Sequence, residues 1–165
     1  SLVIIIITNQ YREQIQNLGL GGYIGLFVIS IIGNATLFLP APVFVVACAA
    51  GLALGPISVG IVAGTGAAIG ELTGYLAGYG GKAIVPEGEL YQRLHAFMDR
   101  HGILAILLLA AIPNPIFDVG GIIAGVLKMP VWKFLIAAAI GKSIRLGVTA
   151  YACQAGIPLL QQIFK

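Results

Sequence analysis

Four charged residues lie inside otherwise apolar stretches of the sequence, and their formal charges sum to zero: Glu71, Asp118, Lys142 and Arg145. Insertion scales put one charge at the centre of a membrane helix at roughly 2.5 to 3.5 kcal/mol, so four unpaired charges would cost about 10 to 14 kcal/mol. That is comparable with the whole stability of an ordinary domain. Arg145 also follows Lys142 by one helical turn on the same face. We therefore expect a buried cluster in which the two carboxylates face the two cations.

This cluster has two interpretations. A purely structural ion-pair network would hold two parts of the chain in register. A functional cluster would form a polar track for a lipid headgroup, in which Lys142 and Arg145 hold the phosphate, the arginine by bidentate contact. A carboxylate beside them could bind an amine headgroup or exchange a proton. Ionisable residues within a membrane are functional by default, which favours the second interpretation.

The second candidate feature is the sequence IPNPIFD at residues 112–118, which interrupts an apolar run. Pro113 and Pro115 prevent a helix from continuing through it. In hydrocarbon an unpaired backbone N–H or C=O costs several kcal/mol, so irregular backbone is tolerated only where protein or a water-filled cavity satisfies it. The sequence therefore predicts a helix break at membrane depth, where Asn114 and the freed backbone groups can hydrogen-bond a ligand.

A similar break lies in the first half, where Pro40 and Pro42 interrupt an apolar run between Gly19 and Leu54. The pieces on either side are short for a complete membrane span, which needs about 20 residues. The favoured arrangement is a re-entrant hairpin. The alternative is a full-length helix that the prolines only kink.

The composition indicates the class of protein. Of 165 residues, 59% are hydrophobic and 9% are charged, against roughly 25% charged in soluble domains. The chain is therefore expected to be a polytopic, all-α integral membrane protein with one domain over residues 1–165, without a basic stripe for nucleic acid. Cys48 and Cys153 stand beside alanines and are expected to be small buried hydrophobes. No metal, cofactor or catalytic constellation is expected, so the chain is not predicted to be an enzyme.

Two long helices are expected in addition to the broken segments. One covers residues 57–81, and the other covers residues 130–153 with Trp132 near its start as an interfacial anchor. Residues 8–18 are polar and suit a helix end or an interfacial segment. Residues 154–165 are expected to form a tail.

Residues 82–101 form the hydrophilic connection between the two halves. Apolar side chains at helical spacing predict a short amphipathic helix on the membrane surface. Its two histidines, His95 and His101, are expected to be solvated interfacial residues rather than a metal or pH-sensing site. The apolar side chains are Leu90, Leu94, Phe97 and Met98.

Glycine recurs in the helix over residues 57–81 as a stripe with mostly four-residue spacing, which lets another helix approach to backbone contact. Tight packing within the chain is a sufficient explanation. Oligomerisation through the same stripe is the alternative. The glycines of the stripe are Gly60, Gly64, Gly70, Gly74 and Gly78.

The two halves of the sequence share landmarks in the same order. PAPVF at residues 40–44 corresponds to PNPIF at residues 113–117, and AAIGE at residues 67–71 corresponds to AAIGK at residues 138–142. An Ala-Gly pair and a later proline lie between these landmarks in both halves. Chance similarity in a chain rich in alanine and glycine is the alternative, but the conserved order favours an internal duplication.

Each repeat is then a Pro-broken helical hairpin followed by a transmembrane helix. The first repeat covers about residues 19–81, the connection residues 82–101 and the second repeat about residues 102–153. A single crossing helix after each hairpin places the two copies in opposite orientations. The predicted fold is therefore an inverted repeat, as in secondary transporters, whose binding sites lie near the midplane.

On this topology, most basic residues fall on one side of the membrane. The positive-inside rule then places the connection over residues 82–101 in the cytoplasm. The residues on that side are Lys82, Arg93, Arg100, Lys128 and Lys133, while Arg12 and Lys165 lie on the other.

Three segments resemble the VTT domain of the DedA superfamily: GAAIGELTGY at residues 66–75, AIPNPIFDVGGIIAG at residues 111–125 and IGKSI at residues 140–144. They are most similar to its vacuole membrane protein branch, which has comparable I-G-E, P-N-P-x-F-D and I-G-K elements. The resemblance covers residues 40–150 and implies two oppositely placed re-entrant hairpins and phospholipid scrambling or lipid-carrier flipping. By position, the residues at the family's motif sites are Glu71, Pro113, Asn114, Pro115, Asp118, Gly125 and Lys142.

The sequence departs from the commoner bacterial DedA pattern at three positions. Phe44 takes the place of an acid after the first P-x-P, and Ala110 and Ile116 stand where arginines flank the second break. These departures favour energy-independent scrambling over proton-coupled export.

The predicted function is movement of phospholipid headgroups across the bilayer through a polar groove between the repeats. Its partners are phospholipids or a lipid carrier, with protons if transport is coupled. The alternatives are a proton- or ion-coupled transporter of a lipid carrier or small solute, and a non-transporting membrane scaffold. The expected membrane is the cell (inner) membrane in a prokaryote and an endoplasmic-reticulum-type membrane in a eukaryote. The predicted site residues are Glu71, Asn114, Asp118, Lys142 and Arg145.

Overall fold

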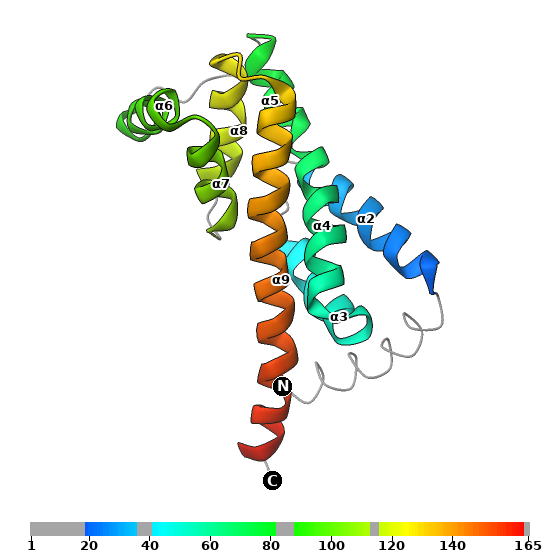
Figure 1. Ribbon diagram of the computed structural model, residues 1–165. Helices are drawn as coiled ribbons and strands as arrows, with labels where there is room; N and C mark the ends of the chain where they lie inside the picture. Colours follow the sequence, from blue (N-terminus) through cyan, green and yellow to red (C-terminus); the bar gives the residue numbers. More distant parts are fainter. Residues whose placement is uncertain (1–18, 36–40, 82–87, 113–115, 164–165) are drawn as a thin grey trace.

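The computed structural model describes residues 19–35, 41–81, 88–112 and 116–163. These residues form helices joined by short turns, and no strand occurs among them, in agreement with the predicted all-α class. Figure 1 shows the helices along the chain. They are α2 (Leu20–Ala35), α3 (Ala41–Leu54), α4 (Pro56–Gly70), α5 (Leu72–Tyr79), α6 (Glu89–His101), α7 (Ile103–Ala111), α8 (Ile116–Val126) and α9 (Val131–Ile163).

Among the described residues, two helical stretches are long and apolar enough to cross a membrane: Pro56–Tyr79 with 24 residues and Val131–Gly156 with 26. The first consists of α4 and α5, which are separated by the single turn residue Glu71. The backbone amides of Glu71 and Tyr75 still donate to residues four positions earlier, so the helical ladder continues. The two stretches run in opposite directions, because α5 ends near the point where α9 begins (Figure 1). The helix predicted over residues 57–81 is confirmed.

α9 is longer than predicted. It continues to Ile163, whereas the sequence was interpreted as a span that ends at Cys153 and a tail over residues 154–165. Gln154 does not end the helix, because glutamine is a good helix former.

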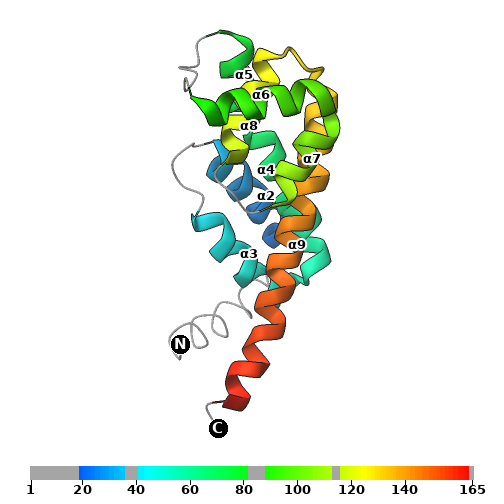
Figure 2. The same cartoon turned by 90° about the vertical axis from the view of Figure 1, so that its left-hand side faces the viewer.

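The chain breaks where predicted in its second half. α7 ends at Ala111 and α8 begins at Ile116, as expected for a helix that meets a Pro-x-Pro sequence. Figures 1 and 2 show that α7 runs away from α6 and that α8 returns beside it to the same end of the molecule. Pro113, Asn114 and Pro115 themselves lie outside the described residues.

In the first half, two separate helices lie on either side of residues 36–40, which are outside the described residues. α2 ends at Ala35 and α3 begins at Ala41, so Pro42 lies in the first turn of α3. The first helical turn tolerates a residue without an N–H, and the role of Pro42 as part of the helix break stays a prediction. Pro40 lies outside the described residues. α2 and α3 form a helix pair whose open end lies where α4 begins (Figure 1).

The two helix pairs pack on the long helices in the same pattern. α2 lies against α4 and α3 against α9, while α7 lies against α9 and α8 against α5. In each pair, the first helix packs on the long helix that follows the pair in sequence. The second helix packs on the other long helix. Apolar side chains form two cores, one among α2, α3, α4 and α9 and one mainly among α5 to α9.

Glycines allow these helices to approach closely at corresponding positions. A Cβ atom at Gly70 would lie 2.9 Å from the Ala35 amide nitrogen in α2, and one at Gly141 would lie 2.6 Å from the Leu107 carbonyl oxygen in α7. Neither position has room for a side chain. Gly70 and Gly141 are the glycines of AAIGE and AAIGK, so the same landmark makes the same kind of contact in both halves.

The predicted glycine stripe divides among three neighbouring helices. Its glycines are buried by intramolecular packing, which agrees with the tight-packing interpretation. Oligomerisation through the stripe stays a prediction. Gly60 and Gly64 face α9, Gly70 faces α2, and Gly74 and Gly78 face α8.

α6 is the amphipathic helix predicted in the connection. Leu94 and Met98 are buried, as expected for its apolar face. Phe97 was assigned to the same face, but it is exposed, and its ring lies 4.7 Å from that of His101. Contact of Phe97 with the membrane surface stays a prediction. His101 is exposed, as predicted, and His95 is half-buried beside Tyr91.

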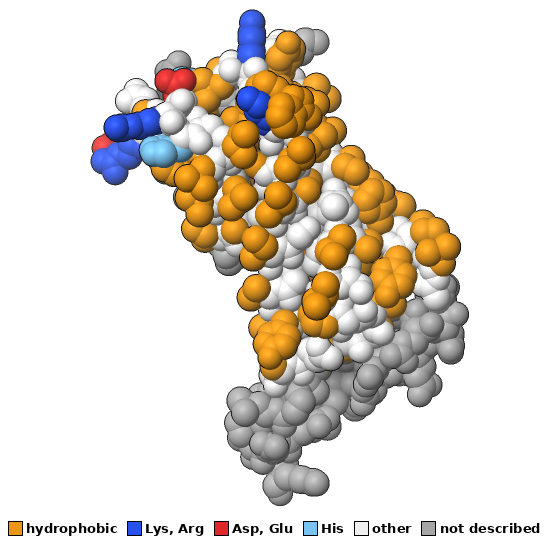
Figure 3. All heavy atoms as spheres, viewed as in Figure 1, with side chains coloured by type: hydrophobic (Ala, Val, Ile, Leu, Met, Phe, Trp, Pro, Cys, Tyr) orange, Lys and Arg blue, Asp and Glu red, His pale blue; other side chains and the backbone are white. Residues whose placement is uncertain are grey.

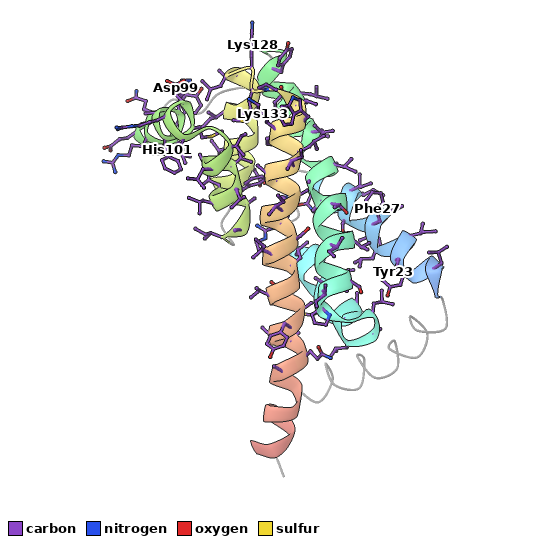
Figure 4. The ribbon with its side chains drawn as sticks, viewed as in Figure 1. Tyr23, Phe27, Asp99, His101, Lys128 and Lys133 are labelled. Carbon is purple, nitrogen blue, oxygen red and sulfur yellow. A yellow bond between two sulfur atoms is a disulfide. The ribbon has the colours of Figure 1, made fainter. Side chains whose placement is uncertain are left out.

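Charged side chains gather at the end of the molecule that carries α6, which we call the basic end. Figure 3 shows lysine, arginine and acidic side chains there, above a flank on which hydrophobic side chains are widespread. Figure 4 labels Asp99, His101, Lys128 and Lys133 at this end. The predicted grouping is confirmed for the described basic residues Arg93, Arg100, Lys128 and Lys133, whereas Arg12, Lys82 and Lys165 lie outside the described residues.

A disulfide joins Cys48 in α3 to Cys153 in α9. The prediction that both cysteines are small buried hydrophobes is therefore wrong. The two residues are 105 positions apart in sequence, and the packing of α3 on α9 brings their Cα atoms to 5.5 Å. No local sequence signal reveals such a pairing.

We expect Gly125→Ala to destabilise the fold, since a Cβ at this position of α8 would lie 2.6 Å from the Tyr79 amide nitrogen. Overpacking of this kind costs roughly 1 to 3 kcal/mol. Thermal unfolding in detergent should therefore show a lower midpoint. Gly25→Ala in α2 is the matched control, because nothing lies within 4 Å of its Cβ position, and alanine should leave the midpoint equal or higher. Equal midpoints for the two variants would contradict close packing of α8 on α5.

Candidate functional site

Glu71 and Lys142 form a buried ion pair that joins the two long helices. The Lys142 Nζ atom donates a hydrogen bond to Glu71 Oε1, and the two residues are 4% and 1% exposed. Glu71 occupies the turn between α4 and α5. Lys142 lies about 17 Å along the α9 axis from Val131, which is close to the middle of a hydrocarbon layer of about 30 Å.

Asn34 in the last turn of α2 is a further partner of Lys142. Its Oδ1 atom accepts a hydrogen bond from Lys142 Nζ at 2.7 Å, and its Nδ2 atom donates to the Ser30 carbonyl oxygen at 2.9 Å. The second bond orients the amide so that its oxygen faces the lysine. We call Glu71, Lys142 and Asn34 the buried network. Sequence reasoning missed Asn34, although an amide within an apolar run was the signal that could have found it.

α8 covers the other side of the ion pair. The Lys142 ammonium lies 4.8 Å from the centre of the Phe117 ring, within the range of a cation–π contact. Gly121, one turn further along α8, faces the carboxylate, because a Cβ there would lie 3.7 Å from Glu71 Oε2. The buried network therefore lies among helices from both halves of the chain: α2, the α4 and α5 junction, α8 and α9.

Asp118 and Arg145, the other two predicted charges, are half-buried near this ion pair. Asp118 interacts electrostatically with both Lys142 and Arg145, and Arg145 also interacts with Glu71. The structure thus brings the four predicted charges into one region, with the pair of Glu71 and Lys142 in direct contact. Asn114, the remaining predicted site residue, lies outside the described residues.

This arrangement has a definite chemical capacity. In the closed structure each charge neutralises the other, so both can stay in an apolar interior. If α2 or α8 moved away from the long helices, the same groups would offer an ammonium and a carboxylate at mid-depth of the membrane. Such a pair can exchange its internal contact for contacts with an anionic or zwitterionic ligand.

Residues 39–155 match the family model described as the VTT domain. The chain belongs to the VTT domain family. The match includes all four charges of the site and both cysteines, while Asn34 precedes it. The predicted resemblance is confirmed.

The chain is also similar to curated vacuole membrane proteins. It is 51% identical over 39 residues to Vacuole membrane protein KMS2 of Arabidopsis thaliana, which is 24% of this chain and 9% of that protein. It is 42% identical over 56 residues to Vacuole membrane protein 1 homolog of Dictyostelium discoideum, covering 34% of this chain and 14% of that protein. It is 32% identical over 104 residues to Vacuole membrane protein 1 of Homo sapiens, covering 49% of this chain and 26% of that protein.

The matched regions therefore span about a quarter or less of these relatives. No solved structure matches the chain. The family match and these relatives place the chain in the VTT and DedA family near the vacuole membrane protein branch. Together with the apolar helices, they identify a membrane protein.

We expect Lys142→Met to destabilise the protein by roughly 3 to 5 kcal/mol, because it leaves the Glu71 carboxylate buried without its partner. The double variant Glu71→Gln with Lys142→Met removes both charges and should recover most of this loss. Thermal or denaturant unfolding in detergent measures both. Lys128→Met makes the same substitution at an exposed position and should leave the midpoint unchanged. If the double variant were no more stable than Lys142→Met alone, the ion pair would not be the source of the effect.

Proposed function

We propose that this protein moves phospholipid headgroups across the bilayer as an energy-independent scramblase. The observation that carries the proposal is the buried network, which holds a cation, a carboxylate and an amide at mid-depth between helices of both halves. A purely structural role does not require charges, since apolar residues of similar volume in place of a buried ion pair are often neutral or stabilising. The proposal includes no chemical change to the lipid, so the protein acts as a transporter and not as an enzyme.

In this proposal, α2 with α3 and α7 with α8 are re-entrant hairpins that enter the membrane from opposite sides, and the two halves are inverted repeats. The reciprocal packing of the two helix pairs on the long helices supports this arrangement. The equivalent contacts of Gly70 with α2 and of Gly141 with α7 support it as well. Transporters of this architecture bind their substrates near the midplane, where the broken segments of the repeats meet.

The buried network lies on the lipid path and binds the headgroup once the path has opened. Glu71 and Lys142 are almost fully buried, so a headgroup reaches them only when α2 or α8 separates from the long helices. The lipid phosphate then replaces Glu71 as the partner of Lys142. Arg145 lies one turn further on the same face of α9 and shares that phosphate by bidentate contact.

The released carboxylate of Glu71 then takes up the amine of a headgroup that has one, and Asp118 adds to the negative charge on that side. The acyl chains stay in the surrounding lipid. A polar route of this kind lowers the barrier that a headgroup otherwise meets in about 30 Å of hydrocarbon.

Fluorescent-phospholipid scrambling in proteoliposomes tests this function. We expect the native chain to exchange labelled lipid between the leaflets without a pH gradient. Glu71→Gln and Lys142→Met should each lower the initial rate about tenfold or more, which corresponds to ~1.4 kcal/mol in the barrier. Folded variants that scramble at the native rate would contradict a lipid path through the network.

Arg93→Gln is the matched control for loss of a charge. It removes an exposed cation whose partner, Glu89, is also exposed, so its scrambling rate should equal the native rate. Transport only under an imposed pH gradient would instead favour proton-coupled flipping. Folded native protein that moves no lipid under either condition would favour a solute transporter or a scaffold.

A further inference from the structure

The Cys48–Cys153 disulfide lies far from the basic end of the molecule. Lys133 belongs to the first turn of α9, and Cys153 lies about 30 Å further along the same helix axis at 1.5 Å per residue. That distance equals the thickness of the hydrocarbon layer. Figure 2 shows α6 near the top of the molecule and α3, which carries Cys48, well below it.

Two independent chemical signatures therefore assign the same orientation. Disulfides persist in oxidising compartments and are rare in the cytosol. Basic residues beside membrane spans accumulate on the cytoplasmic side. Since the disulfide lies toward the end of the span Val131–Gly156 that is remote from the basic end, each signature supports the orientation that the other assigns.

The disulfide connects the first helix pair to the helix that carries Lys142. Gly51, one turn beyond Cys48, packs so closely that its Cβ would lie 2.7 Å from the Ala150 Cβ in α9. The other helix of the pair, α2, holds Asn34 against Lys142. A movement that withdraws Asn34 by separating the pair from α9 must therefore act against a covalent link in α3.

We propose that the Cys48–Cys153 disulfide is a redox latch, formed toward the non-cytoplasmic side, which holds α3 against α9, limits separation of the α2 and α3 pair from the long helices and so restrains opening of the buried network. The effect of the latch on lipid movement rests on the proposed function. The existence of the latch, its side of the membrane and its effect on α2 and α3 do not.

The latch forms by thiol–disulfide exchange with a disulfide oxidant of the compartment. The thiolate of one cysteine attacks the oxidant and releases one of its sulfurs as a thiol, which leaves a mixed disulfide. The second cysteine then attacks its partner's sulfur and releases the other oxidant thiol. The two protein thiols lose two electrons and two protons in total, and the oxidant gains them; a dithiol reductant reverses the process.

Thiol labelling in sealed, oriented membrane vesicles tests the latch and its side. A membrane-impermeant phosphine applied to the non-cytoplasmic face should make both cysteines reactive to a polyethylene-glycol maleimide after solubilisation. The same reagent confined to the cytoplasmic face should leave both unlabelled. Labelling without any reductant, or equal labelling after treatment of either face, would overturn the proposal.

Backbone hydrogen exchange tests the restraint without reference to transport. We expect reduction to accelerate exchange in α2 and α3 about tenfold, a modest effect for the loss of a crosslink. The double variant Cys48→Ser with Cys153→Ser should exchange at the reduced rate with or without reductant. Ala49→Ser with Ala152→Ser adds the same hydroxyls one position away and should behave as the native chain. Unchanged exchange on reduction would overturn the latch.

Scrambling by oxidised and reduced protein then separates the two proposals. The latch predicts about a tenfold higher rate on reduction in the native chain and no response in the serine double variant. Faster hydrogen exchange on reduction with no lipid movement in either state would contradict the proposed function and support the latch. Equal scrambling in both states together with unchanged hydrogen exchange would contradict the latch and support the proposed function.

Discussion

A charge inside a membrane protein must have a partner, and this requirement determines where the helices of this chain meet. Lys142 lies near the middle of the apolar span Val131–Gly156. An ammonium without partners is costly at the centre of a membrane. Its partners come from three other places: the carboxylate from the α4 and α5 junction, the amide oxygen from α2 and the aromatic ring from α8. Both helix pairs must therefore reach the same point from different sides.

Close helix packing is the second condition for this arrangement. Short polar side chains such as Asn34 reach the lysine only if the backbones of α2 and α4 are in near contact, and Gly66 and Gly70 permit that contact. Gly141 and Gly125 serve the second helix pair in the same way, against α7 and α5. These four glycines thus allow helices of both halves to approach the same ion pair.

Glu71 and Lys142 occupy corresponding positions in the two halves of the sequence. Duplication of one segment places the same residue at both copies of a position, and two like charges in contact would repel. Here the corresponding positions of AAIGE and AAIGK hold Glu71 and Lys142, which attract. The opposite charges at these corresponding positions therefore form a contact that joins the two halves of the chain.

Charge balance and helix breakers made much of this fold predictable. The cost of unpaired charges predicted the approach of Glu71 to Lys142, and Pro-x-Pro chemistry predicted the end of α7. Prediction failed where the deciding contact is remote in sequence. Asn34 gains its role only because α2 packs on α4 within reach of Lys142 in α9, and Cys48 meets Cys153 only because α3 packs on α9.

Exchange of the two charges tests most directly whether this ion pair joins the two halves. Glu71→Lys alone and Lys142→Glu alone each place two like charges in contact, so both should lose folded protein and lipid scrambling. The double exchange restores an opposite pair and should recover both folded protein and scrambling. Single reversals that fold and scramble like the native chain, or a double exchange no better than either reversal, would contradict the role assigned to the pair.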